Sequence, residues 1–223
     1  QIGFKFSQKT EFTINPVWLE MIQSQKTFFN NSKMKKILVT GGLGYIGSHA
    51  SVLLLKAGYE LVVVDNLSNS SLLTIDSIKE ITKKDFIFIE ADLCDQEEIS
   101  NIFKNHNLES VIHFASLKAI NDSCKMPLKY YENNLNGTIH LLKNMNEHNI
   151  KKLVYSSSAS VYGDIKDPPV NEDFPTENPT NPYGMTKLII ENILKDLYES
   201  DKDWSIACLL YTSPSPRDKT VSR

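Results

Sequence analysis

Apolar positions along the chain follow two alternating patterns. Short runs of five or six mostly apolar residues are typical of strands that are buried on both faces of a sheet. The segments between them place apolar residues three or four positions apart, as in helices with one buried face. The runs predict six strands: Lys36–Thr40, Glu60–Asp65, Phe86–Glu90, Ser110–Phe114, Lys152–Ser156 and Ser205–Leu209.

Helices are expected to fill the gaps between these strands. The clearest are Ile46–Ala57, Asp95–Asn105, Leu128–Asn149 and Pro182–Ser200. Gly58 suits a helix C-cap and Pro182 suits a helix start. Because strands and helices alternate throughout, the chain is predicted to form an α/β fold, a doubly wound parallel sheet of the Rossmann type with right-handed crossovers and helices on both faces.

The turn after the first predicted strand carries glycines three residues apart. Gly41 permits a tight turn, Gly44 lets the backbone approach an anion, and Gly47 allows the next helix to pack closely. The helix that starts near Tyr45 directs free N–H groups at the same place. Asp65 ends the second strand 18 positions after Gly47, where the ribose of NAD requires a hydrogen-bond acceptor. The segment therefore predicts a site for a dinucleotide, NAD.

Polar and small residues follow several of the other predicted strands. Ligands of such sheets bind beyond the carboxyl ends of the strands. We therefore expect one crevice to gather Asp65, Asp92, Phe114-Ala115 and Ser156–Ser158.

Composition and charge narrow the classes of function. A net charge of −3 over 223 residues gives no electrostatic argument for nucleic acid or for an anionic membrane surface. No apolar run approaches the roughly 18 residues that span a bilayer. Cys94, Cys124 and Cys208 are odd in number, far apart and without metal-ligand spacing, which predicts core or surface thiols rather than disulfides or a metal site. An intracellular location, the cytoplasm, fits best.

The two ends of the chain differ from its middle. Residues 1–33 begin with Gln and show no sustained period, so Met34 is expected to be the true start; a genuine amino-terminal extension is the alternative. Pro214 and Pro216 closely follow the sixth strand, where proline would forbid a central strand. The string from Cys208 to Arg223 also resembles a translated sequencing adapter. We expect a non-native or disordered leader at 1–33, an NAD-binding domain at 34–207 and a non-native tail at 208–223.

A second constellation carries candidate chemistry. Tyr183 and Lys187 are four residues apart and hence on one face of a predicted helix. The usual pKa of tyrosine, about 10, is too high for a base at neutral pH, but a nearby lysine charge and a positive nicotinamide ring both favour phenolate. Ser158 ends the preceding strand, where its hydroxyl could hydrogen-bond the reacting oxygen. The set predicts removal of a proton from a sugar hydroxyl.

These motifs, taken together, resemble the extended short-chain dehydrogenase/reductase superfamily, and within it the UDP-glucose 4-epimerase family. The likeness runs from about Lys35 to Ala207 and covers only the first half of a family member. It rests on Leu38-Val-Thr-Gly-Gly-Leu-Gly-Tyr-Ile-Gly-Ser-His49, Asp65-Asn-Leu-Ser-Asn-Ser70, His113-Phe-Ala-Ser-Leu-Lys-Ala119, Ser156-Ser-Ser-Ala-Ser-Val-Tyr-Gly163 and Pro182-Tyr-Gly184. Ser116 departs from the glycine common there. The resemblance implies a fold truncated before the substrate domain.

The resemblance also assigns roles to residues. It implies Tyr183 as catalytic base, Lys187 as its pKa partner and ribose anchor, and Ser158 as the residue that hydrogen-bonds the substrate. The implied NAD-binding residues are Gly41, Gly44, Tyr45, Ile46 and Gly47 for the pyrophosphate, Asp65 and Asn66 for the adenosine ribose, Asp92 and Leu93 for the adenine, Phe114, Ala115 and Lys118 for the middle of the cofactor, Asn133 for the neighbouring backbone, and Tyr183 and Lys187 again.

Simpler roles compete with several of these assignments. Asp92 could serve only as a turn or cap residue, Asn133 could only cap or line a helix, and Lys118 could be a solvated surface charge. His113 is expected to be a packed strand residue, not a catalyst. Tyr162 is as consistent with a structural role as with substrate contact.

The intact parent is therefore expected to be an isomerase that interconverts UDP-glucose and UDP-galactose by reversible oxidation at sugar C4 with NAD. A nucleotide-sugar dehydratase or another epimerase is the nearest alternative, although a dehydratase commonly needs Asp-Glu where Ala159-Ser160 stand. The other alternative is an NAD-binding fragment without catalysis, and the printed residues alone are expected to be inactive. A homodimer of the parent is expected through the helices Asp95–Asn105 and Leu128–Asn149.

Overall fold

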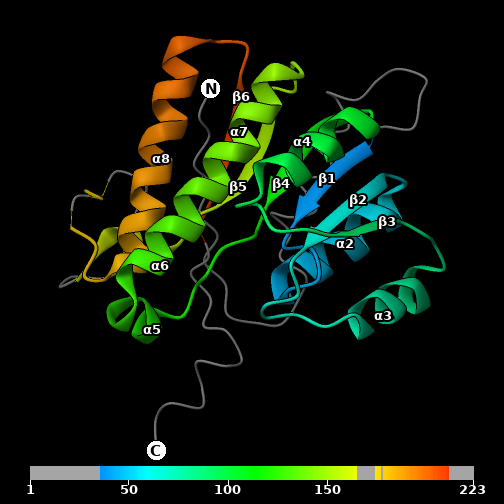
Figure 1. Ribbon diagram of the computed structural model, residues 1–223, viewed down its shortest axis with the longest axis horizontal. Helices are drawn as coiled ribbons and strands as arrows, with labels where there is room; N and C mark the ends of the chain where they lie inside the picture. Colours follow the sequence, from blue (N-terminus) through cyan, green and yellow to red (C-terminus); the bar gives the residue numbers. More distant parts are fainter. Residues whose placement is uncertain (1–35, 165–173, 177, 211–223) are drawn as a thin grey trace, which may run out of the picture.

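Six parallel strands form one sheet in the computed structural model, which describes residues 36–164, 174–176 and 178–210 (Figure 1). The strand order is β3-β2-β1-β4-β5-β6, and every pair is parallel. The strands are β1 (Lys36–Thr40), β2 (Glu60–Asp65), β3 (Ile87–Glu90), β4 (Leu108–His113), β5 (Lys152–Ser156) and β6 (Ser205–Leu209). The predicted doubly wound α/β fold is confirmed. Four strands have the predicted bounds, while β3 starts one residue later and β4 two residues earlier.

Helices cover both faces of the sheet and create two separate cores. Neighbouring residues of β1 point to opposite faces, so Leu38 packs in one core and Val39 in the other. The helices are α2 (Tyr45–Ala57), α3 (Leu73–Thr82), α4 (Gln96–Asn105), α5 (Ile120–Lys125), α6 (Pro127–Tyr131), α7 (Gly137–Glu147) and α8 (Pro182–Ser200). Leu54 of α2 and Ile78 of α3 lie in the core with Val39, whereas α4, α7 and α8 cover the other face (Figure 1).

The predicted helix Leu128–Asn149 is wrong as a single element. The chain instead forms α6, then a π-helical turn at Glu132–Asn136, then α7. The predicted helix placed no interruption at this turn. The cause lies in tertiary contacts, since the side chain of Asn134 hydrogen-bonds residues outside its own helix.

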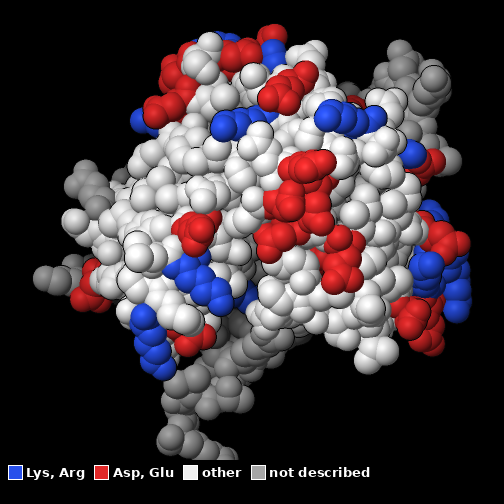
Figure 2. All heavy atoms as spheres, viewed as in Figure 1, with Lys and Arg blue, Asp and Glu red and all other residues white. Residues whose placement is uncertain are grey.

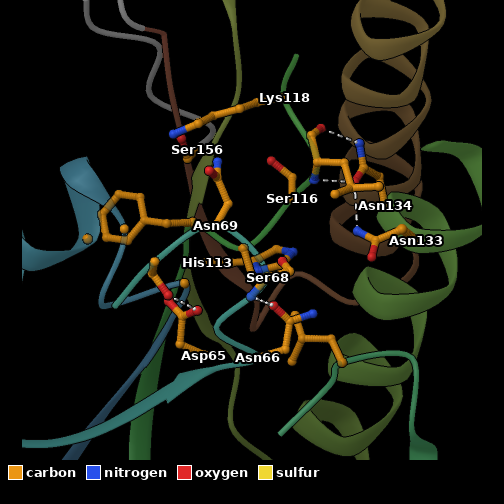
Figure 3. Close-up of a pocket in the computed structure, with 18 of the residues that line it drawn as sticks. Asp65, Asn66, Ser68, Asn69, His113, Ser116, Lys118, Asn133, Asn134 and Ser156 are labelled. Carbon is orange, nitrogen blue, oxygen red and sulfur yellow. Dashed lines mark hydrogen bonds between the residues drawn. The ribbon is translucent and has the colours of Figure 1, made fainter. Parts of the chain in front are cut away.

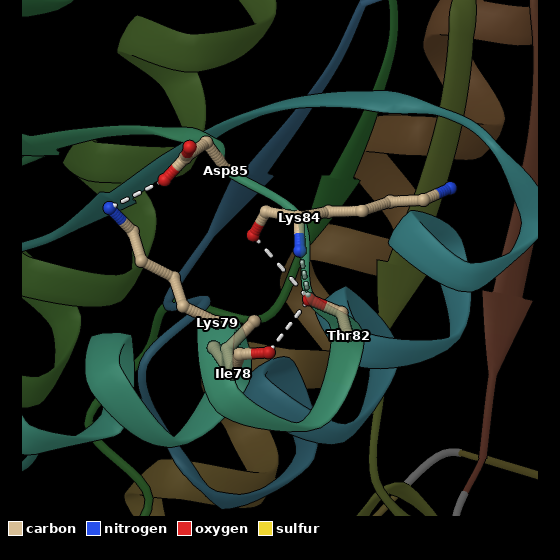
Figure 4. A network of polar contacts seen from close by, with 5 residues as sticks. All are labelled: Ile78, Lys79, Thr82, Lys84 and Asp85. Atoms are coloured by element: carbon tan, nitrogen blue, oxygen red, sulfur yellow. Dashed lines mark hydrogen bonds and ion pairs between the residues drawn. The ribbon is translucent and has the colours of Figure 1, made fainter.

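Helices α3 and α5 and a short 3₁₀ turn at Ala159–Tyr162 were not among the clearest predicted elements. Helix α3 has only one fully buried residue, Ile78, while Leu73 at its start is 74% exposed. Only a short part of α3, around Ile75 and Ile78, therefore packs on the core. The end of α3 depends on local polar contacts that Figure 4 shows: Thr82 Oγ1 donates to the Ile78 carbonyl at 2.7 Å and accepts from the Lys84 N–H at 3.3 Å, and Lys79 pairs with Asp85 at 2.9 Å.

The predicted helix caps are confirmed. Gly58 ends α2 in the left-handed conformation with φ 97°, and its N–H bonds the Leu55 carbonyl. Pro182 lies in the first turn of α8, and the Asn181 side chain accepts from the Gly184 N–H at 2.8 Å. Asn181 and Pro182 fix the start of the helix that carries Tyr183 and Lys187.

Surface charge is uneven on the face drawn in Figure 2, where acidic side chains gather near the middle and lysines are spread around them. No helix within the described ranges is long and apolar enough to cross a membrane.

The expected leader at 1–33 lies outside the described residues, as does the expected tail beyond 210. Of that tail, Cys208 and Leu209 complete β6, and Cys208 is buried.

We expect Gly47→Ala to destabilise the chain by about 1–3 kcal/mol, the usual cost of overpacking. An added Cβ would lie 2.2 Å from the Gly41 carbonyl oxygen, so α2 would have to move off the glycine turn. Urea unfolding of residues 1–223 measures the effect. Gly44→Ala is the matched control, because its Cβ would meet only the Gly41 oxygen at 3.3 Å and its φ of −68° suits alanine. Equal losses for both variants would contradict the argument.

Candidate functional site

A cavity of about 510 Å³ opens at the carboxyl ends of the strands (Figure 3). From β1 the chain adds β2 and β3 on one side of the sheet, and then β4, β5 and β6 on the other side of β1. A crevice forms between β1 and β4, where the strand order reverses. All predicted site residues line this cavity: Gly41, Gly44, Tyr45, Ile46, Gly47, Asp65, Asn66, Asp92, Leu93, Phe114, Ala115, Lys118, Asn133, Ser158, Tyr183 and Lys187. The structure therefore brings together residues that are up to 146 positions apart in the sequence, from 41 to 187.

The glycine turn lines the cavity and leads directly into the start of α2. Gly41 adopts φ +66°, and an added Cβ would lie 2.6 Å from the Ala115 nitrogen, so only glycine fits there. Gly44 is the N-cap of α2, with no side-chain cap and no acidic residue in the first turn. The start of α2 therefore carries partial positive charge that no side chain neutralises, which is the arrangement that binds phosphate.

Asp65 connects the glycine turn to the loop after β2. Its side chain accepts from the Leu43 N–H at 3.1 Å, from the Leu67 N–H at 3.1 Å and from the Ser70 hydroxyl at 2.7 Å. Asp65 is only 8% exposed. The sequence argument assigned it one role, that of a ligand acceptor, and missed this structural role. Oδ1 accepts two of these bonds and Oδ2 one, which leaves one acceptor site of the carboxylate, on Oδ2, for a ligand.

Asn66 and Asp92 are joined at the far end of the cavity. Asn66 Nδ2 donates to Asp92 Oδ2 at 3.0 Å, and the other Asp92 oxygen accepts from the Cys94 N–H at 2.8 Å. The second bond is the turn role proposed as the alternative for Asp92. The backbone and Asn66 hydrogen bonds favour the carboxylate and hold the pKa of Asp92 below its usual value, despite the opposing effect of burial.

The π-helical turn between α6 and α7 positions two asparagines at the cavity, which Figure 3 shows beside Ser116. Asn134 is buried, and its amide uses its hydrogen-bonding groups fully. Its oxygen accepts from the Leu117 N–H at 2.8 Å and from Asn133 at 3.0 Å, while its nitrogen donates to the Leu117 carbonyl and to Thr186 Oγ1, both at 3.0 Å. Sequence reasoning missed Asn134. It ties the loop after β4 to helix α8, and π-helical turns are frequent at functional sites.

Tyr183, Lys187 and Ser158 meet at one end of the cavity. Lys187 is 2% exposed, and its Nζ donates to the Ser156 carbonyl at 2.8 Å. The same nitrogen lies 5.8 Å from the centre of the Tyr183 ring, and a hydrogen bond links Tyr183 to Ser158. The two helical residues therefore face the end of β5, as their spacing predicts.

The electrostatics differ from the simple expectation. Burial raises the pKa of Tyr183 above its usual value, although the Ser158 hydrogen bond acts in the opposite direction. Burial also lowers the pKa of Lys187 to about 7, against the favourable influence of Glu191. The protein alone therefore favours the neutral phenol of Tyr183, and the expected phenolate depends on the second expected contribution, a positive nicotinamide ring.

His113 and the cysteines take no part in this chemistry. His113 is buried between Thr40 Oγ1 at 2.7 Å and Thr138 Oγ1 at 2.9 Å, and burial lowers its pKa to about 3. It is a neutral core residue, as predicted. Cys94, Cys124 and Cys208 are free thiols. Within the described ranges, no group of three or more His, Cys, Asp or Glu residues could hold a metal ion.

Several further residues line the cavity without having been assigned to it. These are Ser68, Asn69, Ser70, Asp122, Lys129 and Tyr130 among others. The first three belong to the quoted segment Asp65–Ser70, so a signal existed. The others come from α5 and α6, which polar sequence patterns do not distinguish from ordinary surface helices. Ser116 has no positive φ, so serine fits where a glycine was expected.

Comparisons with known proteins agree with this geometry. A family model described as GDP-mannose 4,6 dehydratase matches residues 38–223. A UDP-glucose 4-epimerase of Bacillus subtilis is 55% identical over 178 residues, which are 80% of this chain and 52% of that protein. One from Dictyostelium discoideum is 52% identical over 179 residues, with the same shares. The crystal structure of UDP-glucose 4-epimerase from Bifidobacterium longum in complex with NAD+ and UDP has a TM-score of 0.78 and 44% identity over 79% of this chain and 53% of that one. The chain spans about half the length of the curated relatives it matches.

We expect the stability of the chain to rise with pH from about 7, the folded pKa of Lys187. Unfolded lysine has a pKa of about 10.4, so between these values the unfolded state binds one proton more, and each pH unit adds at most about 1.4 kcal/mol. Lys187→Met should remove this rise. Urea unfolding at a series of pH values measures it, with Lys195→Met, an exposed lysine of α8, as the matched control. Parallel profiles for Lys187→Met and the unsubstituted chain would contradict the assignment.

Proposed function

We propose, from the premise that the chain belongs to the family described as GDP-mannose 4,6 dehydratase, that its parent is an NAD-dependent isomerase that interconverts UDP-glucose and UDP-galactose. The observation that carries the proposal is that Tyr183, Lys187 and Ser158 line the same cavity as the glycine turn. The names of the relatives from Bacillus subtilis and Dictyostelium discoideum support the substrate. The sugar C4 is the centre that must react.

The cavity suits NAD on chemical grounds. The uncapped start of α2 offers N–H groups to a pyrophosphate, and the space beside Gly44 would be narrowed by a side chain. Asp65 offers an oriented carboxylate oxygen to ribose hydroxyls. The solved structure from Bifidobacterium longum, which was crystallised with NAD+ and UDP, supports this choice of cofactor.

The residues at the end of β5 handle the proton. NAD, when bound, supplies the acceptor for the hydride of C4 and a positive ring charge. Tyr183 takes the proton of the sugar 4-hydroxyl, and Ser158 hydrogen-bonds the same oxygen as it becomes a carbonyl. The 4-ketopyranose then turns over, the hydride returns to C4 on its other face, and Tyr183 returns its proton to the oxygen, which becomes a hydroxyl again. No net oxidation results, so the enzyme is an isomerase.

Lys187 serves this chemistry in two ways. Its ammonium lies near the Tyr183 ring and favours the phenolate electrostatically. The Ser156 carbonyl fixes the position of its Nζ, and the donors that remain can bind ribose hydroxyls. A lysine that is 2% exposed can hold only one position, so the two roles are compatible.

A dehydratase is the second candidate, because the matching family model carries that description. Elimination of water needs an acid and a base beside the sugar. Ala159 and Ser160 follow Ser158 where that pair is expected, and the Ser160 N–H donates to Ser158 Oγ at 3.2 Å. This 3₁₀ turn carries no carboxyl group, which favours the epimerase.

Two further features of the parent belong to the proposal. A homodimer through α4 and the α6–α7 segment is part of the proposal, and α4 and α7 lie side by side in the chain. A cytoplasmic location is supported by three free cysteines, because thiols persist in reducing compartments.

The Asp65 carboxylate should make the chain prefer NAD to NADP, because it would repel a 2′-phosphate. Asp65→Asn keeps the side-chain shape and should shift the ratio of affinities toward NADP by on the order of tenfold. Titration of both dinucleotides into residues 1–223 measures the ratio. Asp76→Asn, an exposed acid of α3, is the control. Equal or tighter binding of NADP by the unsubstituted chain would refute the assignment.

Tyr183→Phe in the full-length parent should lower turnover by on the order of 10²–10⁴ because the proton acceptor is lost. NAD binding should remain, since only one hydroxyl is removed. Conversion of UDP-galactose to UDP-glucose measures turnover. Tyr131→Phe, which lies outside the cavity lining, should leave it unchanged. A rate near that of the unsubstituted enzyme would mean that Ser158 or a water molecule takes the proton instead.

A further inference from the structure

Three consecutive serines at the end of β5 face three successive turns of helix α8. Ser158 hydrogen-bonds Tyr183, the Ser156 carbonyl accepts from Lys187 Nζ at 2.8 Å, and the Ser157 hydroxyl donates to Glu191 Oε1. Tyr183, Lys187 and Glu191 are spaced four residues apart, so they lie in one row along the helix. The mechanism uses the first two of these contacts and leaves the third without a role.

The contact of Glu191 is buried together with its surroundings. Ser157 is 3% exposed and Lys187 2% exposed, and Glu191 is partly buried one helical turn beyond Lys187. A carboxyl group and an ammonium group brought this far from water are each costly unless a partner of opposite charge is near. The hydrogen bond from Ser157 and the charge of Lys187 both favour the Glu191 carboxylate, against burial, which raises its pKa.

Several charged and titratable residues influence the pKa of Lys187, and Glu191 is the one among them with a carboxyl group. Cys208 of β6 is a further titratable neighbour, while the charge of Lys118, which lines the cavity from the loop after β4 (Figure 3), repels the ammonium. The other titratable neighbours are Tyr155 of β5, whose ring centre is 4.9 Å from Nζ, Tyr183 of α8 and His113 of β4. Both tyrosines, His113 and Cys208 are neutral near pH 7, so the Glu191 carboxylate opposes the Lys118 charge.

We propose that Glu191 is a positioning residue of the site: held by Ser157, its carboxylate keeps Lys187 in the ammonium form and holds the end of β5 against α8. Through Ser157 it orients the serine segment that presents Ser158 to Tyr183. The role in ligand binding rests on the proposed function, since Lys187 is there the anchor for ribose. The charge coupling to Lys187 does not depend on it.

Glu191→Gln separates charge from shape, because glutamine retains an oxygen that can accept from Ser157. Loss of the carboxylate should lower the pKa of Lys187, so the rise of stability with pH should start on the order of one pH unit lower. Urea unfolding of residues 1–223 at a series of pH values measures this onset. At each pH, the free energy of unfolding of the matching Lys187→Met variant is subtracted from that of each protein. This difference removes the titration of the groups that do not interact with Lys187.

Asp196→Asn is the matched control, since Asp196 is an exposed acid on the same helix. It should leave the onset within a few tenths of a pH unit. An onset in Glu191→Gln that equals the control would overturn the proposal. If Glu191→Gln does not fold, Ser157→Ala tests the same contact. That variant should weaken NAD binding at pH 7 at least severalfold relative to Asp196→Asn, and unchanged binding would overturn the positioning role.

NAD titration across pH distinguishes the two proposals. If Lys187 binds ribose as an ammonium, the affinity for NAD should fall as the pH rises. In Glu191→Gln this fall should occur at lower pH, displaced by the same number of pH units as the onset of the rise in stability. A merely structural loss would weaken binding equally at every pH and would overturn the proposal. If the unsubstituted chain shows the stability onset but binds no NAD, the proposed function fails, whereas the charge coupling of Glu191 and Lys187 stands.

Discussion

The pairing of strand β1 is the constraint on which the site depends. β1 bonds β2 on one side and β4 on the other, with Thr40 opposite Val64 and His113. All three strands therefore end at the same level, and the segments that follow them diverge to opposite sides. The glycine turn, the Asp65 loop and the loop after β4 meet in the space between them. Close approach fixes their positions, since Gly41 has no room for a side chain beside Ala115.

The second half of the site is organised by polar contacts rather than by the sheet. Lys187 and Glu191 of α8 contact the backbone and side chains at the end of β5, and Asn134 joins the same helix to the loop after β4 through Thr186 and Leu117. Buried polar groups are costly when unpaired, so each of these contacts permits few alternatives. Helix α8 thus carries Tyr183 in a frame that is held at several points.

The sheet, the glycine turn and the Tyr183–Lys187 pair could be predicted from the sequence because they depend on local patterns. Asn66, Leu93, Lys118 and Asn133 were assigned only through the family resemblance. Apolar runs identify strands, glycine spacing identifies the turn, and a four-residue spacing places Tyr183 and Lys187 together. The π-helical turn could not be predicted, since the contacts that favour it, from Asn134 to Leu117 and Thr186, join residues 17 and 52 positions apart. The shifted pKa values also depend on burial, which no single spacing reveals. Asp65 shows both cases: its position was predictable, but its bond to the Leu43 N–H was not.

Burial gives the Tyr183–Lys187 pair a property that the motif alone does not suggest. Both groups are displaced toward their neutral forms, because the pKa of Tyr183 is raised and that of Lys187 is lowered to about 7. A neutral phenol does not act as the base, and the raised pKa leaves less of Tyr183 as phenolate in the protein by itself. Positive charge brought into the cavity by a ligand would stabilise the phenolate, and the Glu191 carboxylate would keep Lys187 charged against the repulsion of that ligand. Proton removal would then be confined to the state in which a hydride acceptor is present, which prevents the base from acting alone.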